Sequence, residues 1–187
     1  MTSQVTALIE KARAARRNDR LDEARHAAWQ ALEAAKANAD GPGISSAQAM
    51  LGQVARDCGD APEAISWYTA AAEGCRQRNA TRSLAHALRH IGDIHLDLQQ
   101  LEKAEPLYEE ALQIYRTQDD LSPLELANAI RSVALLKSQQ NERASAIDLW
   151  REARSLYEAT GIQPGVEECS DWLHRLDGRE DRQPDPS

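Results

Sequence analysis

The sequence lacks phenylalanine altogether, has only three cysteines among its 187 residues, and contains no run of about 18 apolar residues. Without such a run, no helix is expected to span a membrane. The cysteines, Cys58, Cys75 and Cys169, are too few and too scattered for a disulfide framework or a zinc ribbon. The first residues also lack the basic and apolar segments of a secretory signal. We therefore expect a soluble cytoplasmic protein that has no membrane partner.

Positive charge is scarce as well. Lysine and arginine together number 22 against 30 aspartates and glutamates, so the formal net charge is -8. This balance argues against binding to nucleic acid or anionic lipid, which requires clustered basic residues. The motifs of phosphate-binding loops, dinucleotide-binding folds, hydrolase nucleophile elbows and zinc proteases are missing from the sequence. We expect a protein that is not an enzyme, needs no cofactor and binds no nucleic acid.

The residues that are abundant favour helices. Alanine, leucine, glutamate, glutamine and arginine are strong helix formers, whereas the residues that prefer strands are sparse. Between the glycines and prolines, apolar residues recur at three- and four-residue spacing, as in Leu84, Leu88 and Ile91. No segment alternates apolar and polar residues over enough positions for a strand. The sequence predicts an all-α protein.

The chain also repeats itself. A small residue recurs at intervals of 40, 40 and 42 residues, at Ala24, Ala64, Ala104 and Ala146. In the last three copies a large ring follows four positions later, and another small residue precedes by 12 positions, which gives the sets Gly52 with Tyr68, Gly92 with Tyr108, and Ala134 with Trp150. Small residues that face large rings allow two helices to pack closely. The pattern predicts a series of helical hairpins.

These hairpins resemble tetratricopeptide repeats, and residues 84–116 match the family pattern best, with Leu88, Gly92, Ala104 and Tyr108 at signature positions. The resemblance implies a right-handed α-solenoid of antiparallel helical hairpins in one domain, residues 1–176, followed by a disordered tail, 177–187. The expected hairpins are about 4–40, 45–80, 84–120 and 124–160, with a capping helix over 166–176. A period above the usual 34 residues implies a longer second helix and resembles the long-repeat type of bacterial regulators and light-chain-type cargo adaptors.

Turn and cap residues mark the ends of these helices. Left-handed stops are predicted between paired helices at four equivalent positions, which are Asp19, Gly59, Gln99 and Asn141. Ser122 precedes a proline and should cap its helix through the hydroxyl group. Asp60 should cap the helix that contains Glu63 in the same way.

The resemblance implies that the first helices of the hairpins line a concave groove that binds a protein or peptide. The candidate groove residues are Arg13, Arg17, Gln53, Arg56, His86, Arg89, His90, Asp93, Asn128 and Arg131. The planar guanidinium groups of Arg89 and Arg131 suit carboxylates, so the expected partner has an acidic segment or a free C-terminus. Met50, Leu96 and Leu135 would add apolar contact area. The expected function is a non-enzymatic adaptor or scaffold.

Three alternatives remain open at this point. In the first, the charged face serves no ligand at all and is the solvated surface of a scaffold. A regulatory protein that senses a small peptide is the second alternative. In the third, His86, His90 and Asp93 hold a metal ion, because two histidines one helical turn apart plus a carboxylate suit zinc or nickel. The same spacing also describes an ordinary hydrogen-bonded helix face.

Overall fold

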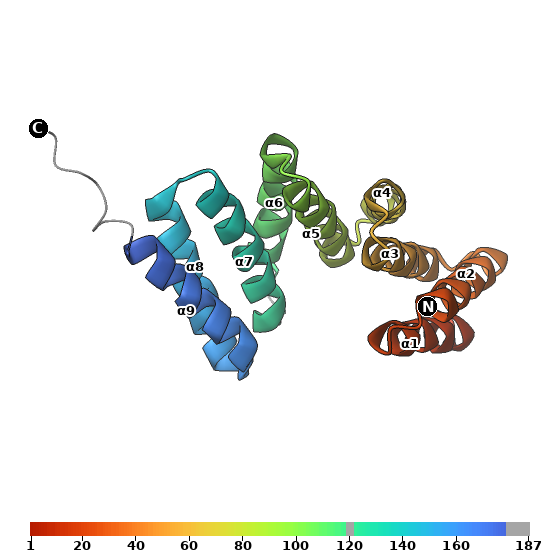
Figure 1. The fold of residues 1–187 in the computed structure, drawn as a ribbon. Coiled ribbons are helices and arrows are strands. Elements are labelled where there is room, and N and C mark those ends of the chain that lie inside the picture. The colour runs from red at the N-terminus through yellow and green to blue at the C-terminus, as the bar shows by residue number, and fades with distance from the viewer. Residues whose placement is uncertain (119–121, 179–187) are drawn as a thin grey trace, which may run out of the picture. The chain divides into compact units, whose positions relative to one another are not determined.

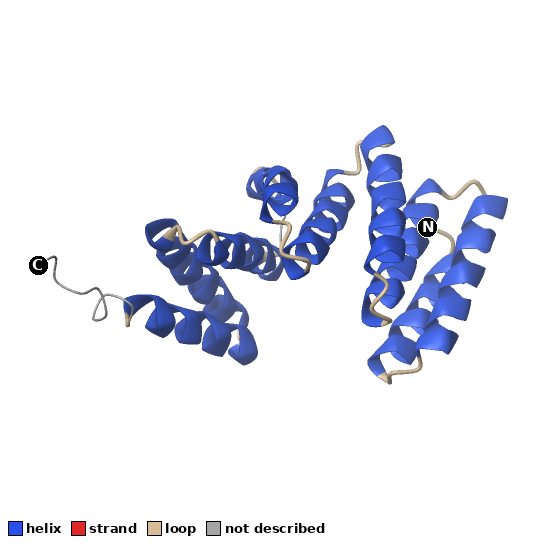
Figure 2. Ribbon diagram, turned by 45° about the horizontal axis from the view of Figure 1, so that its top comes forward, coloured by secondary structure: helices blue, strands red, loops and turns tan. Residues whose placement is uncertain are grey.

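The computed structural model describes residues 1–118 and 122–178, and within these ranges all regular structure is helical (Figures 1 and 2). In the described part of the chain, nine helices follow one another in antiparallel pairs, which confirms the predicted all-α hairpin architecture. The chain forms two compact units, Met1–Leu98 and Gln99–Ser187, which are described separately below as unit 1 and unit 2. No helix in the described ranges is long and apolar enough to cross a membrane.

Unit 1 contains five helices, each packed against the next (Figure 1). Their bounds are α1 Ser3–Arg17, α2 Leu21–Ala37, α3 Gly41–Asp57, α4 Ala61–Gln77 and α5 Thr81–Asp97. Helices α1 and α3 also contact each other directly. The first helices of successive hairpins therefore lie next to one another on one side of the unit.

Unit 2 contains four helices with the same serial packing. Their bounds are α6 Leu101–Arg116, α7 Pro123–Gln139, α8 Arg143–Thr160 and α9 Gln163–Asp177. Helix α9 corresponds to the capping helix predicted over 166–176 and packs against α8. Of the tail predicted over 177–187, only Asp177 and Gly178 belong to the described residues; the other positions lie outside them.

The extra length of the repeat is shared by both helices of a hairpin. Helices α3 and α4 each contain 17 residues, so the longer second helix that the resemblance implied is wrong. The connections stay short because a residue with positive φ reverses the chain. Asp19, Gly59, Gln99 and Asn141 have φ values of 57°, 78°, 58° and 61°, which confirms the four predicted left-handed stops.

The helix caps agree with the sequence at one of the two predicted places. The Asp60 carboxylate accepts a hydrogen bond of 2.9 Å from the Glu63 backbone N–H, as predicted. Ser122 occupies the cap position of α7, but its hydroxyl makes no capping hydrogen bond, so that expectation is wrong. Asp40 is a cap that the sequence analysis missed, with a 3.0 Å bond from the Gly43 N–H.

Small residues do bring paired helices together in the core. A Cβ atom placed on Gly52 would lie 2.8 Å from Cδ2 of Tyr68, so only glycine permits this approach of α3 to α4. The Tyr68, Tyr108 and Trp150 rings are fully buried, as the small-and-large pattern predicted. In unit 2 the Trp150 indole N–H donates a 3.0 Å hydrogen bond to the Ser138 hydroxyl, which satisfies its polar atom in the interior.

Candidate functional site

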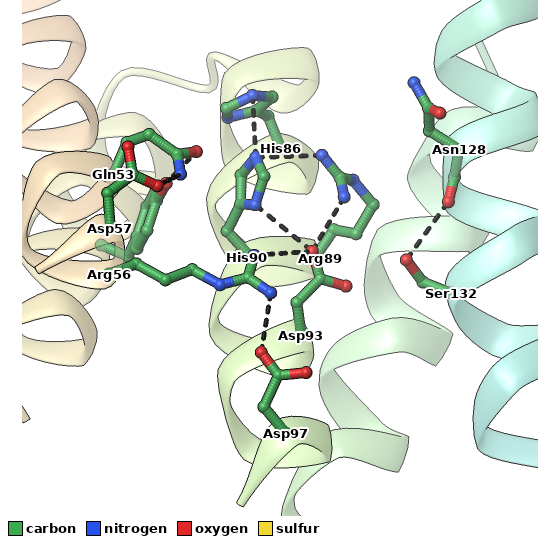
Figure 3. A network of polar contacts seen from close by, with 11 residues as sticks. Gln53, Arg56, Asp57, His86, Arg89, His90, Asp93, Asp97, Asn128 and Ser132 are labelled. Carbon is green, nitrogen blue, oxygen red and sulfur yellow. Dashed lines mark hydrogen bonds and ion pairs between the residues drawn. The ribbon is translucent and has the colours of Figure 1, made fainter. Parts of the chain in front are cut away.

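Side chains of α1, α3 and α5 are joined by ion pairs into a polar surface on unit 1, which we name the polar face of unit 1. Figure 3 shows its residues from α3 and α5. Its residues are Arg13, Arg16 and Arg17 of α1, Gln53, Arg56 and Asp57 of α3, and His86, Arg89, His90, Asp93 and Asp97 of α5. Eight of the ten candidate groove residues lie on these three helices. The other two, Asn128 and Arg131, belong to α7 of unit 2.

Ion pairs join the three helices at regular intervals. The Arg16 guanidinium on α1 donates to the Asp57 carboxylate on α3. One repeat further on, Arg56 donates a 2.8 Å hydrogen bond to Asp97 on α5. Both pairs span 41 residues, because successive hairpins place the same helix position in the same relation to the next first helix. We name these contacts the arginine–aspartate ladder.

Asp93 is the carboxylate at the centre of the α5 cluster, with a side chain that is only 14% exposed. Arg89 Nη1 donates to Asp93 Oδ2 at 2.9 Å, and Arg56 Nη1 lies 3.6 Å from the same oxygen. His90 Nδ1 is 3.3 Å from it as well (Figure 3). The largely buried Asp93 carboxylate thus contacts the Arg56 guanidinium of α3. It also contacts the Arg89 guanidinium and the His90 imidazole of its own helix, α5.

The His90 ring is fixed on both sides. It stacks on the buried Tyr68 ring of α4, with centroids 5.1 Å apart and planes inclined by 21°. Its Nε2 atom lies 3.0 Å from Arg89 Nη2 and 3.3 Å from His86 Nε2. Because a guanidinium nitrogen only donates, His90 Nε2 is the acceptor and the ring proton belongs on Nδ1, facing Asp93.

The charges in this cluster set its protonation. Burial alone would raise the pKa of Asp93, but the hydrogen bond from His90 and the positive charge of Arg89 outweigh burial and lower it below its usual range. Burial lowers the pKa of His90, because it disfavours the charged imidazolium. At neutral pH the cluster therefore holds an ionised Asp93 and a neutral His90.

His86 differs from His90 in that its ring is exposed. Desolvation by the surrounding helices lowers the pKa of His86. The charges of the neighbouring His90, Arg89 and Arg13 lower it further. The exposed edge of the ring keeps contact with water, which moderates the desolvation, while repulsion from the nearby arginines still favours the neutral imidazole.

The histidine pair is built as a hydrogen-bonded network. Among the residues that the structure describes, no group of three or more His, Cys, Asp or Glu side chains is arranged to hold a metal ion. The His90 Nε2 lone pair, which a metal would need, already faces Arg89 Nη2. The geometry therefore gives no support to the alternative in which His86, His90 and Asp93 form a metal centre.

In unit 2 the structure engages both candidate residues internally. The Arg131 guanidinium donates two hydrogen bonds, of 2.6 and 2.5 Å, to the Glu168 carboxylate of α9. The Asn128 side-chain oxygen accepts a 2.8 Å hydrogen bond from the Tyr157 hydroxyl of α8. Arg131 does bind a carboxylate through its planar fork, but that carboxylate comes from the protein itself.

Two further expectations about the groove need correction. Met50 and Leu96 are buried, with 7% and 5% exposure, so these side chains contribute to the core and offer little contact area to a ligand. The sequence analysis also missed Tyr68 as the support of His90 and Glu168 as the partner of Arg131. Tyr68 was visible only as a core ring, and nothing in the sequence connects Glu168 to a residue 37 positions away.

Comparison with known proteins agrees with this architecture. The sequence profile described as "Tetratricopeptide repeat" matches residues 44–117 and 83–159, which together make up more than half of the chain. The chain belongs to the tetratricopeptide repeat family. Repeats of this family generally form protein-binding modules. The first hairpin lies outside the matched residues, and a comparison with curated proteins finds no match.

Solved structures with similar tetratricopeptide-type folds share little sequence with this chain. An aspartyl phosphate phosphatase F from Bacillus subtilis superposes with a TM-score of 0.79 at 14% identity over 91% of this chain. The apo form of RapI gives 0.75 at 13% identity over 95%, and a putative kinesin light chain repeat protein from Podosopora anserina gives 0.57 at 17% over 97%. The chain spans 45%, 71% and 98% of these three chains. Such similarities show a shared fold.

Proposed function

We propose that this tetratricopeptide repeat protein is a non-enzymatic adaptor that binds a segment of a partner protein on the polar face of unit 1. The observation that carries the proposal is the arginine–aspartate ladder together with the Asp93 cluster. Side chains from three successive first helices are held there in one arrangement by ion pairs, a stacked ring and shared hydrogen bonds. A surface that is rigid before binding loses less entropy when a ligand arrives.

Polar side chains at this surface also suit recognition of a peptide. Gln53 donates a 3.1 Å hydrogen bond to Asp57 and accepts one of 3.2 Å from the Tyr68 hydroxyl, which fixes the orientation of its amide. His86 presents an exposed imidazole edge. Oriented amide and imidazole groups can bond the backbone of an extended segment without requiring a specific sequence.

Photo-crosslinking in host cells tests this assignment. A benzoylphenylalanine placed at Gln53 or at the exposed Asp97 on the polar face should capture a defined partner. The matched positions are Gln30 on α2 and Glu73 on α4, which are exposed and belong to helices that contribute nothing to the polar face. Irradiation followed by mass spectrometry identifies the captured protein and the segment attached.

The expected result is a partner captured from the polar-face positions and absent from the two outer positions. Capture from Gln30 and Glu73 alone would overturn the proposal. Charge reversal of Arg89 or Arg131 is a poor test, because each new carboxylate would face Asp93 or Glu168 and disturb the fold.

A regulatory role is the second candidate, supported by the similarity in fold to the aspartyl phosphate phosphatase and to RapI. In that case the solenoid would respond to a small peptide by changing its curvature. Small-angle scattering with and without the captured segment separates the two roles. A compaction on binding favours the regulator, and an unchanged radius of gyration favours the adaptor.

A further inference from the structure

We propose that an acidic segment of the partner docks at the α1 end of the polar face, where Arg13 and Arg17 hold its carboxylates. The inference rests on the proposed function and specifies which chemistry the surface accepts and where. It also differs from the sequence-based expectation, which assigned the carboxylates to Arg89 and Arg131.

The formal charges of unit 1 are unevenly distributed. Helix α1 carries four basic residues, Lys11, Arg13, Arg16 and Arg17, against the single acid Glu10, so its net charge is +3. None of the other four helices of the unit has a net positive charge. In a chain with a net charge of -8, this concentration on one helix is a local positive field.

Only some arginines of the polar face remain available to a ligand. Arg16, Arg56 and Arg89 each have an aspartate partner on the face. Arg17 is exposed and makes no hydrogen bond or ion pair with any residue that the structure describes. Arg13 is half exposed, and Glu10, its partner in the same helix, is exposed to a similar degree. Such an exposed pair contributes only about 0.2–1 kcal/mol and is easily exchanged for a ligand carboxylate.

Arg17 lies on the polar face for a reason that the repeat makes clear. Its equivalents 40 and 80 residues later are Asp57 and Asp97, the two acids of the arginine–aspartate ladder. At this position the first repeat therefore has a positively charged residue, whereas the second and third repeats have the aspartates of the ladder. This end offers an arginine without a partner to an incoming carboxylate.

His86 lies within the influence of the same charges. The Arg13 charge reaches the His86 ring and is one of the influences that lower its pKa, after desolvation and the charges of His90 and Arg89. The Asp93 carboxylate acts in the opposite direction and raises the pKa of His86. An anion bound at Arg13 would remove the part of the repulsion that comes from α1.

The helix dipole offers a simpler explanation for part of this charge. Basic residues in the last turn of a helix interact favourably with its C-terminal end, which accounts for Arg16 and Arg17. It does not account for Arg13, one turn earlier, or for the absence of any partner of Arg17. A basic partner would meet the same uncompensated arginines and be repelled.

Fluorescence anisotropy with a defined probe tests the inference on the full chain. The probe is hexaglutamate with a fluorescein label and an amidated C-terminus, and hexaglutamine with the same ends is its uncharged counterpart. We expect the chain to bind hexaglutamate at 50 mM NaCl, to lose it as salt is raised, and not to bind hexaglutamine. No binding of hexaglutamate to the wild type overturns the inference, whereas the crosslinking result above decides the proposed function independently.

The variant Arg13→Gln/Arg17→Gln locates the site. Losing two charge-assisted contacts should weaken hexaglutamate binding about tenfold or more. The matched control is Arg20→Gln/Lys36→Gln, which removes the same charge at two exposed positions outside the polar face. Equal weakening in both variants would show a non-specific charge effect and overturn the assignment. All four side chains are at least half exposed or unpaired, so thermal unfolding should confirm that the variants fold.

The histidine signals provide a second readout. Titration with hexaglutamate at pH 7 should shift the ring-proton resonance of His86, because an anion bound at Arg13 changes the electric field at an imidazole that already feels the Arg13 charge. His26 on α2 and His174 on α9 are exposed reference signals in the same spectrum. Binding that shifts the reference signals and leaves His86 unchanged would place the acidic segment elsewhere and overturn the inference.

Discussion

At the residue scale, His90 is the residue of the polar face whose side chain is contacted on the most sides. It is buried between the Tyr68 ring and the Asp93 carboxylate, and its second nitrogen faces a guanidinium. The Nδ1 atom lies 3.3 Å from Asp93 Oδ2 but forms no well-aligned hydrogen bond with it. Protonation would put a positive charge beside Arg89 and Arg56, so unit 1 should respond to acid at this residue before its carboxylates titrate.

Acidification should therefore destabilise the protein through His90. The pKa of His90 in the folded protein lies below the unfolded value of about 6.5. The free energy of unfolding is therefore unaffected by His90 above that pH and decreases as the pH falls below it. The decline is at most about 1.4 kcal/mol per pH unit for one histidine. Urea denaturation at pH 7, 6 and 5 measures it, and His90→Gln should flatten the slope. The control His26→Gln changes an exposed residue on α2, and an equal flattening there would contradict the prediction.

Gly52 is a second position at which the structure tolerates little change, because the absence of a side chain there lets α3 approach Tyr68. Gly52→Ala would place a Cβ atom 2.8 Å from the Tyr68 ring and should lower the free energy of unfolding by about 1–3 kcal/mol. In the comparison variant Gly74→Ala, the nearest atoms are Ser45 Oγ at 3.0 Å and Arg78 Nη1 at 3.2 Å, both on side chains that can move. Chemical denaturation should find Gly74→Ala close to wild type, and equal destabilisation by both substitutions would refute the packing argument.

At the element scale, the ion pairs connect first helices that belong to different hairpins. The ladder joins α1 to α3 and α3 to α5, and Arg131 joins α7 to α9 in the same manner. These pairs are partly exposed, so each contributes modestly to stability. Their larger effect is to hold the spacing of neighbouring first helices and thus the shape of the surface that a ligand meets.

A double-mutant cycle on Arg56 and Asp97 measures this link. Alanine substitutions, single and combined, should give a coupling energy of about 0.2–1 kcal/mol that decreases when NaCl is raised to 1 M. The pair Arg20–Glu23 serves as the reference, since both side chains are about half exposed and belong to one turn of the chain. A coupling energy for Arg56–Asp97 below about 0.2 kcal/mol, or one that does not fall with salt, would contradict the prediction that this ion pair links α3 to α5.

At the scale of the whole molecule, each helix packs mainly against its neighbours in sequence within its own unit. Stability in such repeats is a sum of local terms, and damage to one hairpin remains near it. Helix α9 offers a sharp place to test this, because a Cβ atom on Gly165 would lie 2.6 Å from Cδ1 of Tyr157 on α8. The substitution Gly165→Ala should push α9 away from α8.

Hydrogen exchange by mass spectrometry should then show lost protection in α8 and α9 of the Gly165→Ala protein, while α1 and α2 keep wild-type protection. The expectation follows from serial packing within each unit, in which stability is a sum of local terms. Uniform loss of protection in all described helices would mean that the chain unfolds as one cooperative block, against the prediction. The destabilised Gly52→Ala protein provides the reverse case, with the loss concentrated in α3 and α4.

Much of the fold could be predicted because the signals for it are local. Asp19, Gly59, Gln99 and Asn141 were expected to end helices, and all four have positive φ. The rings at Tyr68, Tyr108 and Trp150 were expected inside, and all three are buried. The same kind of reasoning failed for the Ser122 hydroxyl, because the position of a cap follows from the sequence pattern but its hydrogen bond depends on a rotamer.

The membership of the polar face could also be predicted in large part, from the spacing of residues on the first helices. What each side chain does there could not. Arg89 and Arg131 were expected to await a ligand, and the structure pairs them with Asp93 and Glu168. Arg17, which the sequence did not distinguish from its neighbours, is an exposed arginine without a partner among the described residues.

The division has a physical reason. Helix formation, turns and hairpin packing depend on residues a few positions apart, and on a period that the sequence repeats, so the sequence by itself determined the all-α hairpin architecture. The ion pairs between hairpins join side chains 37 to 41 positions apart that meet only after the hairpins stack. The Arg89–Asp93 pair, four positions apart on one helix, could have been foreseen from the sequence. A formal charge in a sequence does not reveal which opposite charge it will meet. Only the tertiary structure decided which arginines are neutralised and which remain available.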